Sequence, residues 1–224
     1  MKTFGKLGAN PVKFSRRDTL ILAASASIAS SLGFGTAQAQ EGTTKDVAAL
    51  ANVAIPDQPI GPADAKVTVI EYASPTCPHC AQFSNDVYPA FKTEYVDSGK
   101  VKFILRPFIR NLQDAVVFLL AYAAGEDKFH QVIETFFKTQ GTWGLAEKPR
   151  AALLEVAKQL GFTEESFDAA LANQELFDGM KKMQEQAASE FKLEGTPTFY
   201  INGKQLTGEK SLEELKAEID PLLA

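Results

Sequence analysis

Cys77-Pro78-His79-Cys80 follows the run Val67-Thr68-Val69-Ile70-Glu71-Tyr72-Ala73, and this stretch decides the fold. Its two cysteines are the only ones among the 224 residues. A disulfide between them closes a loop of four residues, which contributes little stability because the entropic gain grows with loop length. The spacing therefore favours a reversible redox pair. A structural disulfide and one half of a metal site are the alternatives that the spacing leaves open.

The residues around this motif predict a strand–helix–strand unit. Val67–Ala73 is rich in β-branched residues, which is typical of a buried strand. Residues 81–96 predict a helix, and Pro78 occupies a position where a first helical residue tolerates proline. Ser98-Gly99 ends that helix, and Val101–Pro107 predicts a second strand.

The middle of the chain, from residue 112 to residue 194, has helical periodicity. Apolar residues at helical spacing predict five helices, at 112–124, 129–137, 153–160, from Thr163 onward, and 176–191. The block lies between the first strand pair and a second group of strands, so we expect an inserted helical domain at about 110–190.

The C-terminal part predicts a hairpin followed by a helix. Thr198–Ile201 is a strand candidate, Asn202-Gly203 is a strong two-residue hairpin turn, and 205–207 pairs back. Ser211 and Glu214 have the spacing of a capping box that opens a last helix. The chain therefore consists of a βαβ unit and a ββα unit with helices between them.

The first 39 residues have the pattern of an export signal. An apolar stretch at 20–32 is short for a membrane span, and Ala37-Gln38-Ala39 is a cleavage-site pattern. Five basic residues precede the apolar stretch: Lys2, Lys6, Lys13, Arg16 and Arg17. We expect cleavage before Gln40 and a periplasmic location; an uncleaved membrane anchor is the alternative. Ser15-Arg16-Arg17 leaves the twin-arginine and general secretory routes equally open.

The charge of the remaining chain excludes some partners. Removing residues 1–39 removes five basic residues and one acidic residue, which takes the net charge from −5 to −9. A negative protein does not suit nucleic acid or anionic lipid surfaces. Residues 40–65 contain three prolines, and we expect an extended lead-in that wraps the domain. Export also suits the cysteines, since disulfides persist in oxidising compartments.

These residues resemble the thioredoxin superfamily, and specifically the DsbA-like thiol:disulfide oxidoreductases, over residues 65–223. Three features carry the resemblance: the Pro-His dipeptide between the cysteines, Glu71 six residues before Cys77, and Gly195-Thr196-Pro197 just before a strand. The resemblance implies an α/β, thioredoxin-like fold at 66–224 with an inserted helical domain. It also implies a cis bond between Thr196 and Pro197, which the sequence alone does not predict because few X-Pro bonds are cis.

The position of the motif at a helix start suggests how it works. Cys77 precedes the first turn of a helix, where unpaired N–H groups and the helix dipole favour a thiolate. His79 adds a donor or a positive charge beside the sulfurs. We expect Cys77 to be the exposed nucleophile and Cys80 the buried resolving partner. The resemblance assigns Glu71 a role in proton transfer with Cys80, and the alternative for Glu71 is an ordinary polar strand residue.

The loop at Thr196-Pro197 is expected to bind substrate. Pro197 would hold the backbone of Thr196 so that it pairs with an extended substrate segment, as in strand addition. Pro78 has a structural role in the motif. Thr196 is also a departure, since the DsbA oxidases typically have valine there and threonine is common among isomerases and reductases.

We therefore expect an exported dithiol oxidase that forms disulfides in other exported proteins and needs no bound cofactor. The resemblance implies two partners: reduced, cysteine-containing exported proteins and a quinone-linked membrane protein that reoxidises the pair. We also expect a monomer. A monomeric isomerase or reductase is the first alternative, and a non-catalytic binding or chaperone domain is the second.

Two further residues, and the possibility of a metal site, have plainer interpretations. His130 lies between core positions of a predicted helix, which favours a surface or capping histidine. Trp143, in Gly141-Thr142-Trp143-Gly144, is expected to anchor a loop. We expect no metal, because a structural zinc site needs four ligands and no second pair has suitable spacing.

Overall fold

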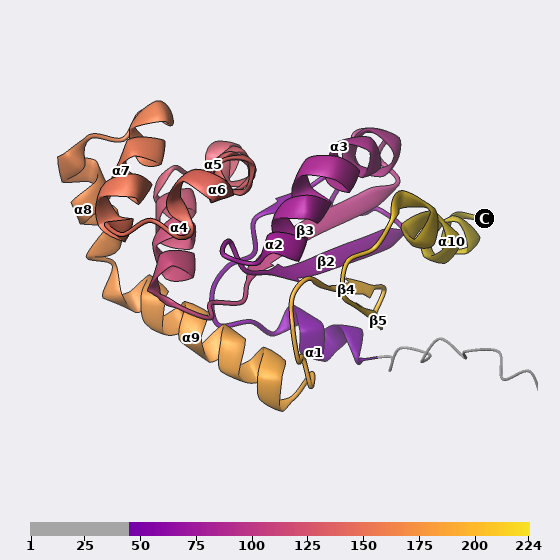
Figure 1. Ribbon diagram of the computed structural model, residues 1–224. Helices are drawn as coiled ribbons and strands as arrows, with labels where there is room; N and C mark the ends of the chain where they lie inside the picture. The colour runs from indigo at the N-terminus through magenta and orange to yellow at the C-terminus, as the bar shows by residue number, and fades with distance from the viewer. Residues whose placement is uncertain (1–44) are drawn as a thin grey trace, which may run out of the picture. The chain divides into compact units, whose positions relative to one another are not determined.

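The computed structural model describes residues 45–224. Its centre is a five-stranded sheet in the order β1-β3-β2-β4-β5 (Figure 1). The strands are β1 Pro59–Ile60, β2 Val67–Ala73, β3 Val101–Pro107, β4 Thr198–Ile201 and β5 Lys204–Thr207. Strands β2 and β3 run parallel, and the other neighbours run antiparallel. The four strands expected from the sequence are present, and β1 is additional.

The parallel pair β2 and β3 requires a crossover, and the helical segment after the motif provides it. This segment runs continuously through α2 Pro78–Gln82, η1 Phe83–Val87, α3 Tyr88–Phe91 and η2 Lys92–Val96. It starts at Pro78, the residue that the sequence indicated as a first helical position. The two η elements are π-helical turns. Pro89 explains the first of them, since proline has no N–H to continue the α-helical ladder.

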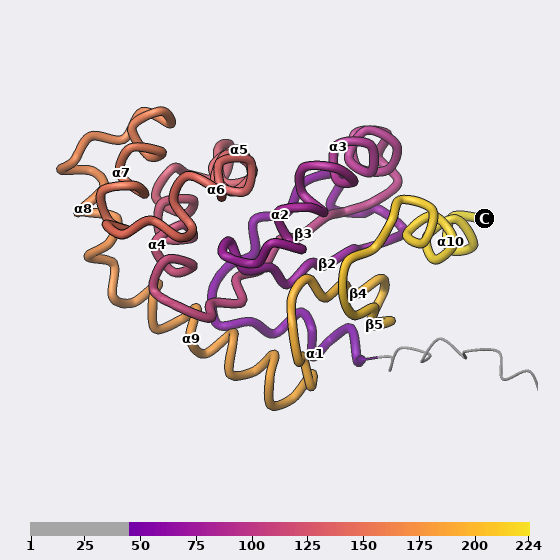
Figure 2. The backbone as a smooth tube through the Cα atoms, viewed as in Figure 1, coloured from indigo at the N-terminus to yellow at the C-terminus, as the bar shows by residue number. Residues whose placement is uncertain are grey.

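The helical insertion consists of six helices among the described residues (Figure 1). They are α4 Leu112–Ala123, α5 Glu126–Lys138, α6 Gln140–Trp143, α7 Pro149–Gln159, α8 Glu164–Leu171 and α9 Gln174–Ser189. Helix α6 was not expected from the sequence, because it is one turn long and contains a glycine. Figure 2 shows how α9 brings the chain back from the insertion toward the sheet.

The lead-in before the sheet differs from the extended segment that we expected. It contains a short helix, α1 Val47–Ala51, and the edge strand β1. Asp46 caps α1 by accepting a hydrogen bond from the Ala48 N–H. Further along, both carboxylate oxygens of Asp57 accept from the buried guanidinium of Arg106 on β3, at 2.8 and 2.6 Å. The segment is therefore fastened to the sheet. Residues 1–44, including the expected export signal, lie outside the described part.

The two faces of the sheet are covered by different elements. Phe83 and Tyr88, from the segment after the motif, pack on Phe199 and Phe103 of one face, with ring centroids 4.8 and 5.1 Å apart. The last helix, α10 Leu212–Leu223, begins with the expected capping box of Ser211 and Glu214 and also contacts α3 and β2. On the opposite face lie Arg106 and α1. Glu71 on β2 belongs to the first face, which places it beneath the motif.

The turn after β1 generates a stability prediction. Gly61 has φ of +86°, and a Cβ there would lie inside van der Waals contact of the Val101 carbonyl oxygen. Gly161 has φ of +92° with nothing within 4 Å of such a Cβ. Gly161→Ala should lower the free energy of unfolding by roughly 1 kcal/mol through φ strain alone. Gly61→Ala should lower it by at least about 1 kcal/mol more, because backbone must move as well. Urea unfolding of both variants checks this, and equal losses would contradict it.

Candidate active site

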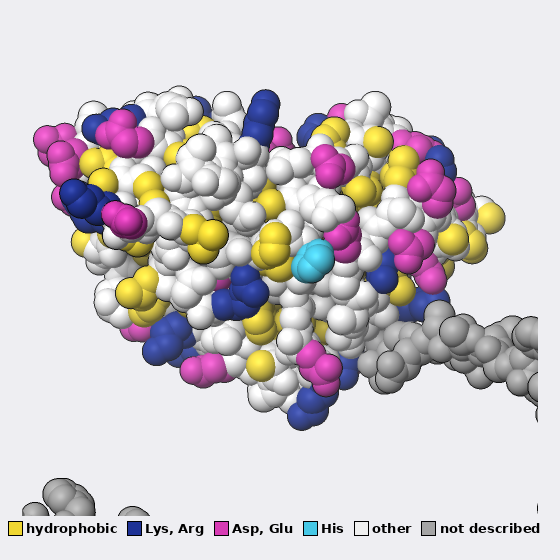
Figure 3. All heavy atoms as spheres, viewed as in Figure 1, with side chains coloured by type: hydrophobic (Ala, Val, Ile, Leu, Met, Phe, Trp, Pro, Cys, Tyr) yellow, Lys and Arg dark blue, Asp and Glu magenta, His cyan; other side chains and the backbone are white. Residues whose placement is uncertain are grey.

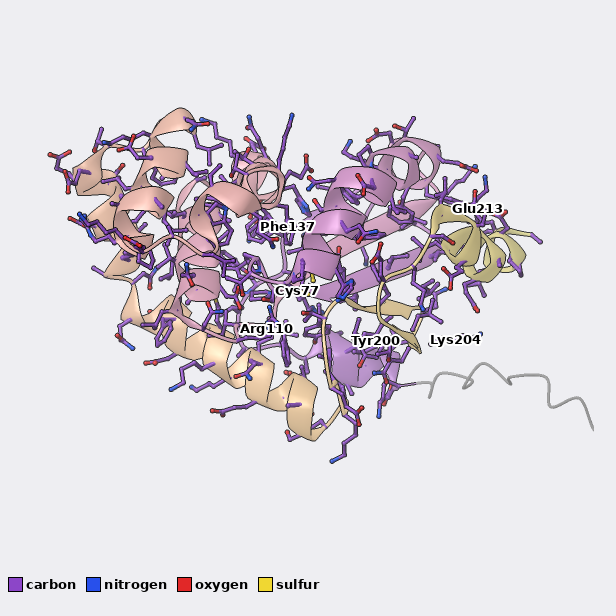
Figure 4. The ribbon with its side chains drawn as sticks, in the orientation of Figure 1. Cys77, Arg110, Phe137, Tyr200, Lys204 and Glu213 are labelled. Carbon is purple, nitrogen blue, oxygen red and sulfur yellow. The ribbon has the colours of Figure 1, made fainter. Side chains whose placement is uncertain are left out.

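The cysteine motif lies where β2 ends and α2 begins. Cys77 is the N-cap of α2 with extended backbone (φ −80°, ψ 121°), and Pro78 is the first helical residue, as expected. Figure 4 shows Cys77 at the start of α2, between Phe137 of the insertion and Arg110. Cys77 is only 3% exposed and Cys80 is 0% exposed. The expectation of an exposed Cys77 is therefore wrong for the residue as a whole, because a loop from elsewhere in the chain covers its sulfur.

That loop is the one that contains the expected cis proline. The bond between Thr196 and Pro197 is cis, as the resemblance implied. In its protonated form Cys77 donates to the Thr196 carbonyl oxygen, with Sγ and O 3.2 Å apart. Apart from the Cys77 sulfur, whose thiolate it helps to stabilise, the buried Thr196 hydroxyl has no hydrogen-bond partner among the described residues. The loop thus places a backbone acceptor and a free hydroxyl directly against the first sulfur.

The surroundings of Cys77 stabilise its thiolate. They lower the pKa of Cys77 from 9.0 to about 5, and the largest cause is a hydrogen bond from the Cys80 side chain. Burial opposes this shift, while the Thr196 side chain and the backbone N–H groups of Cys80 and His79 add to it. These N–H groups belong to the first turn of α2, where a helix has no internal acceptors for them. At neutral pH the first sulfur is therefore an anion.

Cys80 has the opposite character. Burial raises its pKa well above the ordinary value, and the hydrogen bond to Cys77 and the charge on Glu71 raise it further. Glu71 is 2% exposed, and burial raises its pKa to about 8, with the Cys77 charge as the second cause. Its Oε1 has no hydrogen-bond partner among the described residues. The site therefore combines one ionised thiol with a neutral thiol and a carboxyl group that holds its proton near neutral pH.

We expected the His79 side chain to lie beside the sulfurs, but it lies at the surface instead. Its side chain is 66% exposed, and Nδ1 lies 3.3 Å from Oε2 of Glu209, on the loop before α10. The contribution of His79 to the Cys77 thiolate comes from its backbone N–H and not from the imidazole. The side chain points outward because the second residue of α2 faces away from the sheet.

A buried carboxylate, which the sequence analysis missed, fixes the loop before Cys77. Asp114 on α4 is fully buried and accepts from the Ser74 hydroxyl at 2.8 Å and from the Thr76 N–H at 2.7 Å. It also accepts from the Arg110 N–H at 2.9 Å. The only sequence signal is Asn111 before a helix with an acid three residues on, which resembles an ordinary N-terminal cap.

The one-turn helix α6 holds the same loop from the other side. Gln140 donates through Nε2 to the carbonyl oxygens of Pro75 and Cys77, at 2.8 and 3.0 Å. Trp143 at the end of α6 is 0% exposed and donates to the Phe136 carbonyl oxygen at 2.9 Å. Trp143 is therefore an anchor, as expected, although in a helix instead of a loop, and it keeps Gln140 in position.

His130 is not the surface or capping residue that we expected. Its Nε2 donates to the Gln58 carbonyl oxygen at 2.7 Å, and its ring packs against Phe103 and Phe129. Burial lowers its pKa. The helical pattern placed it beside core positions but could not show that the lead-in covers it.

The comparison with protein families decides the assignment. The family model described as thioredoxin matches residues 54–221. The chain belongs to the thioredoxin family. Within it, the chain has the DsbA-like form of the fold, a five-stranded sheet with a helical insertion.

Relatives of this thioredoxin-family chain carry names that refer to disulfide chemistry. A "Putative protein-disulfide oxidoreductase" of Rickettsia bellii is 32% identical over 73% of this chain and 63% of its own length. "Disulfide bond formation protein D" of Bacillus subtilis is 26% identical over 74% of this chain and 77% of its own length. The chain spans about three fifths of the length of the Rickettsia relatives that it matches.

Solved structures share the DsbA-like fold. Alpha-DsbA1 of Wolbachia pipientis superposes with a TM-score of 0.73 at 23% identity, over 78% of this chain and 95% of that one. Oxidised BdbD from Bacillus subtilis gives 0.66 at 22% identity, over 82% and 97%. Within residues 45–224, no three His, Cys, Asp or Glu side chains cluster to hold a metal, and no helix could span a bilayer.

The hydrogen bond from Cys80 generates a prediction about the DsbA-like pair. Cys80→Ala removes the donor, whereas Cys80→Ser keeps a hydroxyl donor at the same position. The pKa of Cys77 should be about 1 to 2 units higher in Cys80→Ala than in Cys80→Ser, the value expected for one hydrogen bond to a charged group. Titration of the ultraviolet absorbance of the thiolate measures both. Equal pKa values would show that Cys80 does not stabilise the anion.

The buried carboxyl generates a prediction about stability. Folded Glu71 binds a proton up to about pH 8, whereas the unfolded chain releases it near pH 4.5, so this group lowers stability as pH rises through that interval. Glu71→Gln should therefore stabilise the reduced protein increasingly with pH, by roughly 1 to 4 kcal/mol at pH 8. Urea unfolding at pH 5 and pH 8 tests this, with Glu185→Gln on the exposed face of α9 as control. A gain that does not depend on pH would contradict it.

Proposed function

We propose that this chain is a thiol:disulfide oxidoreductase that acts as a dithiol oxidase through Cys77 and Cys80. The observation that supports it best is the contrast between the two sulfurs: the environment lowers the pKa of Cys77 to about 5 and raises that of Cys80. Stabilising the reduced form as a thiolate destabilises the disulfide relative to it, which makes the pair a better oxidant.

The reaction begins with the disulfide between the two cysteines. A substrate thiolate attacks Sγ of Cys77, the Cys77–Cys80 bond breaks, and Cys80 leaves as a thiolate that takes the proton of Glu71. A second substrate thiolate then attacks the substrate sulfur of the mixed disulfide, and Cys77 leaves as its stabilised thiolate. The substrate loses two electrons and gains a disulfide, and the cysteine pair is reduced.

Several groups of the site suit these roles. Cys77 is the better leaving group of the two, because its thiolate has the lower pKa. Glu71 lies on the strand beneath the motif and carries the proton that Cys80 needs. Pro197 holds Thr196 against Cys77, where the backbone of an extended substrate would pair. On the face shown in Figure 3, acidic and basic side chains are interspersed around hydrophobic ones, which suits varied protein substrates.

The proposal includes a location and partners. We propose export directed by residues 1–39 into the periplasm, with reduced, cysteine-containing exported proteins as substrates. After each cycle the reduced pair needs an electron acceptor, and a quinone-linked membrane protein is the class that the resemblance implies. The pair itself carries the two electrons, so the exchange needs no bound cofactor.

A reductase or isomerase is the second candidate, and Thr196 is the residue that favours it. The Thr196 side chain contributes to lowering the pKa of Cys77. That contribution alone stabilises the thiolate and favours the oxidising direction, so the case for a reductase or isomerase comes from the resemblance, in which threonine is common at this position among isomerases and reductases. Cys77 and Cys80 perform the same chemistry in both directions.

The resting redox state of Cys77 and Cys80 in the exporting cell distinguishes the two candidates. Acid quenching followed by alkylation should show a largely oxidised pair if the protein is a disulfide donor. In vitro, the oxidised protein should accelerate disulfide formation in a reduced, unfolded protein, and Cys77→Ser should abolish this. A largely reduced pair in the cell would replace the oxidase with the reductase or isomerase. Full activity of Cys77→Ser would remove the oxidoreductase function altogether.

A further inference from the structure

A small internal cavity lies beneath the cysteine pair, between the sheet and the insertion. Its volume is about 10 Å³, which is room for a single water molecule. Glu71, Tyr88, His130 and Glu134 are the titratable residues that line it. Oε1 of Glu71 and the hydroxyl of Tyr88 are both buried without a hydrogen-bond partner among the described residues. Two unpaired polar atoms around one water-sized space indicate a hydrogen-bonded bridge, since buried polar groups are nearly always paired.

The cavity adjoins a groove on the surface. Ser84, Tyr88 and Glu134 line both the cavity and the groove, so their side chains form the wall between them. Glu134 belongs to α5 and is exposed on its outer side. It therefore connects the buried space with solvent from the helical insertion, whereas Glu71 closes the inner end from the sheet.

The charges around Tyr88 are consistent with a position between two carboxyl groups. Burial raises the pKa of Tyr88, and the charges of Glu134 and Glu71 raise it further. Its hydroxyl thus keeps its proton and can donate to one carboxylate while it accepts from another donor. Burial also raises the pKa of Glu134, while Lys92 in the groove opposes this shift. Lys92 itself pairs with Asp97.

We propose that Glu134 is the residue through which Glu71 exchanges its proton with solvent, across the Tyr88 hydroxyl and one water in the cavity. The proposal rests on the proposed role of Glu71 in thiol–disulfide exchange. When Cys80 leaves as a thiolate, it takes the proton of Glu71, and the Glu71 carboxylate then accepts a proton from the Tyr88–water bridge. Glu134 supplies that proton and is itself reprotonated from solvent, so one proton crosses the wall for each thiol formed. Glu134 is a positioning residue that acts through Glu71.

His130 is the other titratable residue in the cavity, and its contacts argue against the same role. Its Nε2 is engaged by the Gln58 carbonyl oxygen at 2.7 Å. It does not line the groove, so it offers no route to solvent. The other titratable groups near Glu71 are Cys77 and Cys80, which are the reacting thiols themselves.

The test measures the rate of the Cys80-dependent exchange step with a dithiol peptide as a function of pH and buffer concentration. The variants are Glu134→Gln, Tyr88→Phe, Glu71→Gln and the double variant of Glu71 and Glu134. Asp127→Asn, on the exposed first turn of the same helix, is the matched control because it also removes one negative charge. All substitutions preserve side-chain size, so the fold is expected to remain intact.

Glu134→Gln and Tyr88→Phe should each slow the step about threefold or more. This loss should be smaller than the roughly 10²–10⁴-fold contribution to the rate that is typical of a residue that transfers the proton directly. Small buffer acids such as imidazole should restore the rate of Glu134→Gln in a concentration-dependent manner, which a structural role would not produce. The double variant should be no slower than Glu71→Gln, because both residues act in one path. Asp127→Asn should behave as wild type.

If Glu134→Gln reacted at the wild-type rate without buffer dependence while Glu71→Gln was slow, the role of Glu134 in proton exchange would be overturned. The role of Glu71 would remain intact. Independent, multiplicative effects in the double variant would also overturn the role of Glu134. A wild-type rate in Glu71→Gln would instead remove the role of Glu71 in the proposed mechanism. Failure of the Glu134 proposal and failure of the proposed role of Glu71 therefore give different results.

Discussion

The stabilisation of one negative charge on Cys77 is the constraint on which the rest of the structure depends. The thiol of a residue that is only 3% exposed would ordinarily avoid ionisation, because burial opposes charge. Donors overcome this penalty: the Cys80 thiol, the Thr196 hydroxyl and the first N–H groups of α2. Each of them must point at the same atom, so the strand end, the helix start and the cis-proline loop are held in one geometry.

The helical insertion contributes to that geometry and is more than a cover for the sheet. Asp114 on α4 binds the loop that leads into Cys77, and Gln140 on α6 binds the carbonyl oxygen of Cys77 itself. Both residues come from helices that the thioredoxin-like half of the chain does not contain. Their hydrogen bonds are buried or partly buried, where breaking one leaves an unpaired group at a cost of about 1 to 3 kcal/mol. The insertion therefore determines where the nucleophile sits.

The sequence could predict the features that are local or that carry a strong pattern. Val67–Ala73 and Val101–Pro107 are strands at the expected residues, since β-branched runs between breakers are distinctive. The Asn202-Gly203 turn and the Ser211 capping box are present because their chemistry involves only neighbouring residues. Glu71 beneath the motif followed from its position on a buried strand together with the family resemblance.

The features that the sequence could not predict depend on contacts between distant segments. The orientation of His79 toward Glu209 and the partial burial of His130 against the lead-in each require a partner more than 70 residues away. Asp114 has an ordinary capping pattern, and nothing in its neighbourhood indicates that Ser74 and Thr76 will reach it. The short helix α6 has two glycines nearby and lacks the length at which periodicity becomes visible. In each case tertiary packing decided what local preference left open.

The proximity of Cys77 and Glu71 links the movement of electrons to that of a proton. The Cys77 charge is one of the two causes that raise the pKa of Glu71, and burial is the larger. In the reduced pair the thiolate is present, so Glu71 keeps its proton next to the neutral Cys80. When the disulfide forms, the Cys77 charge disappears and only burial holds the proton on Glu71, which then releases it more readily. The pKa of the buried carboxyl group therefore depends on the redox state of the cysteines. Because Glu71 gives its proton to Cys80 in the proposed mechanism and must regain one, a path that connects it to solvent becomes part of the exchange reaction.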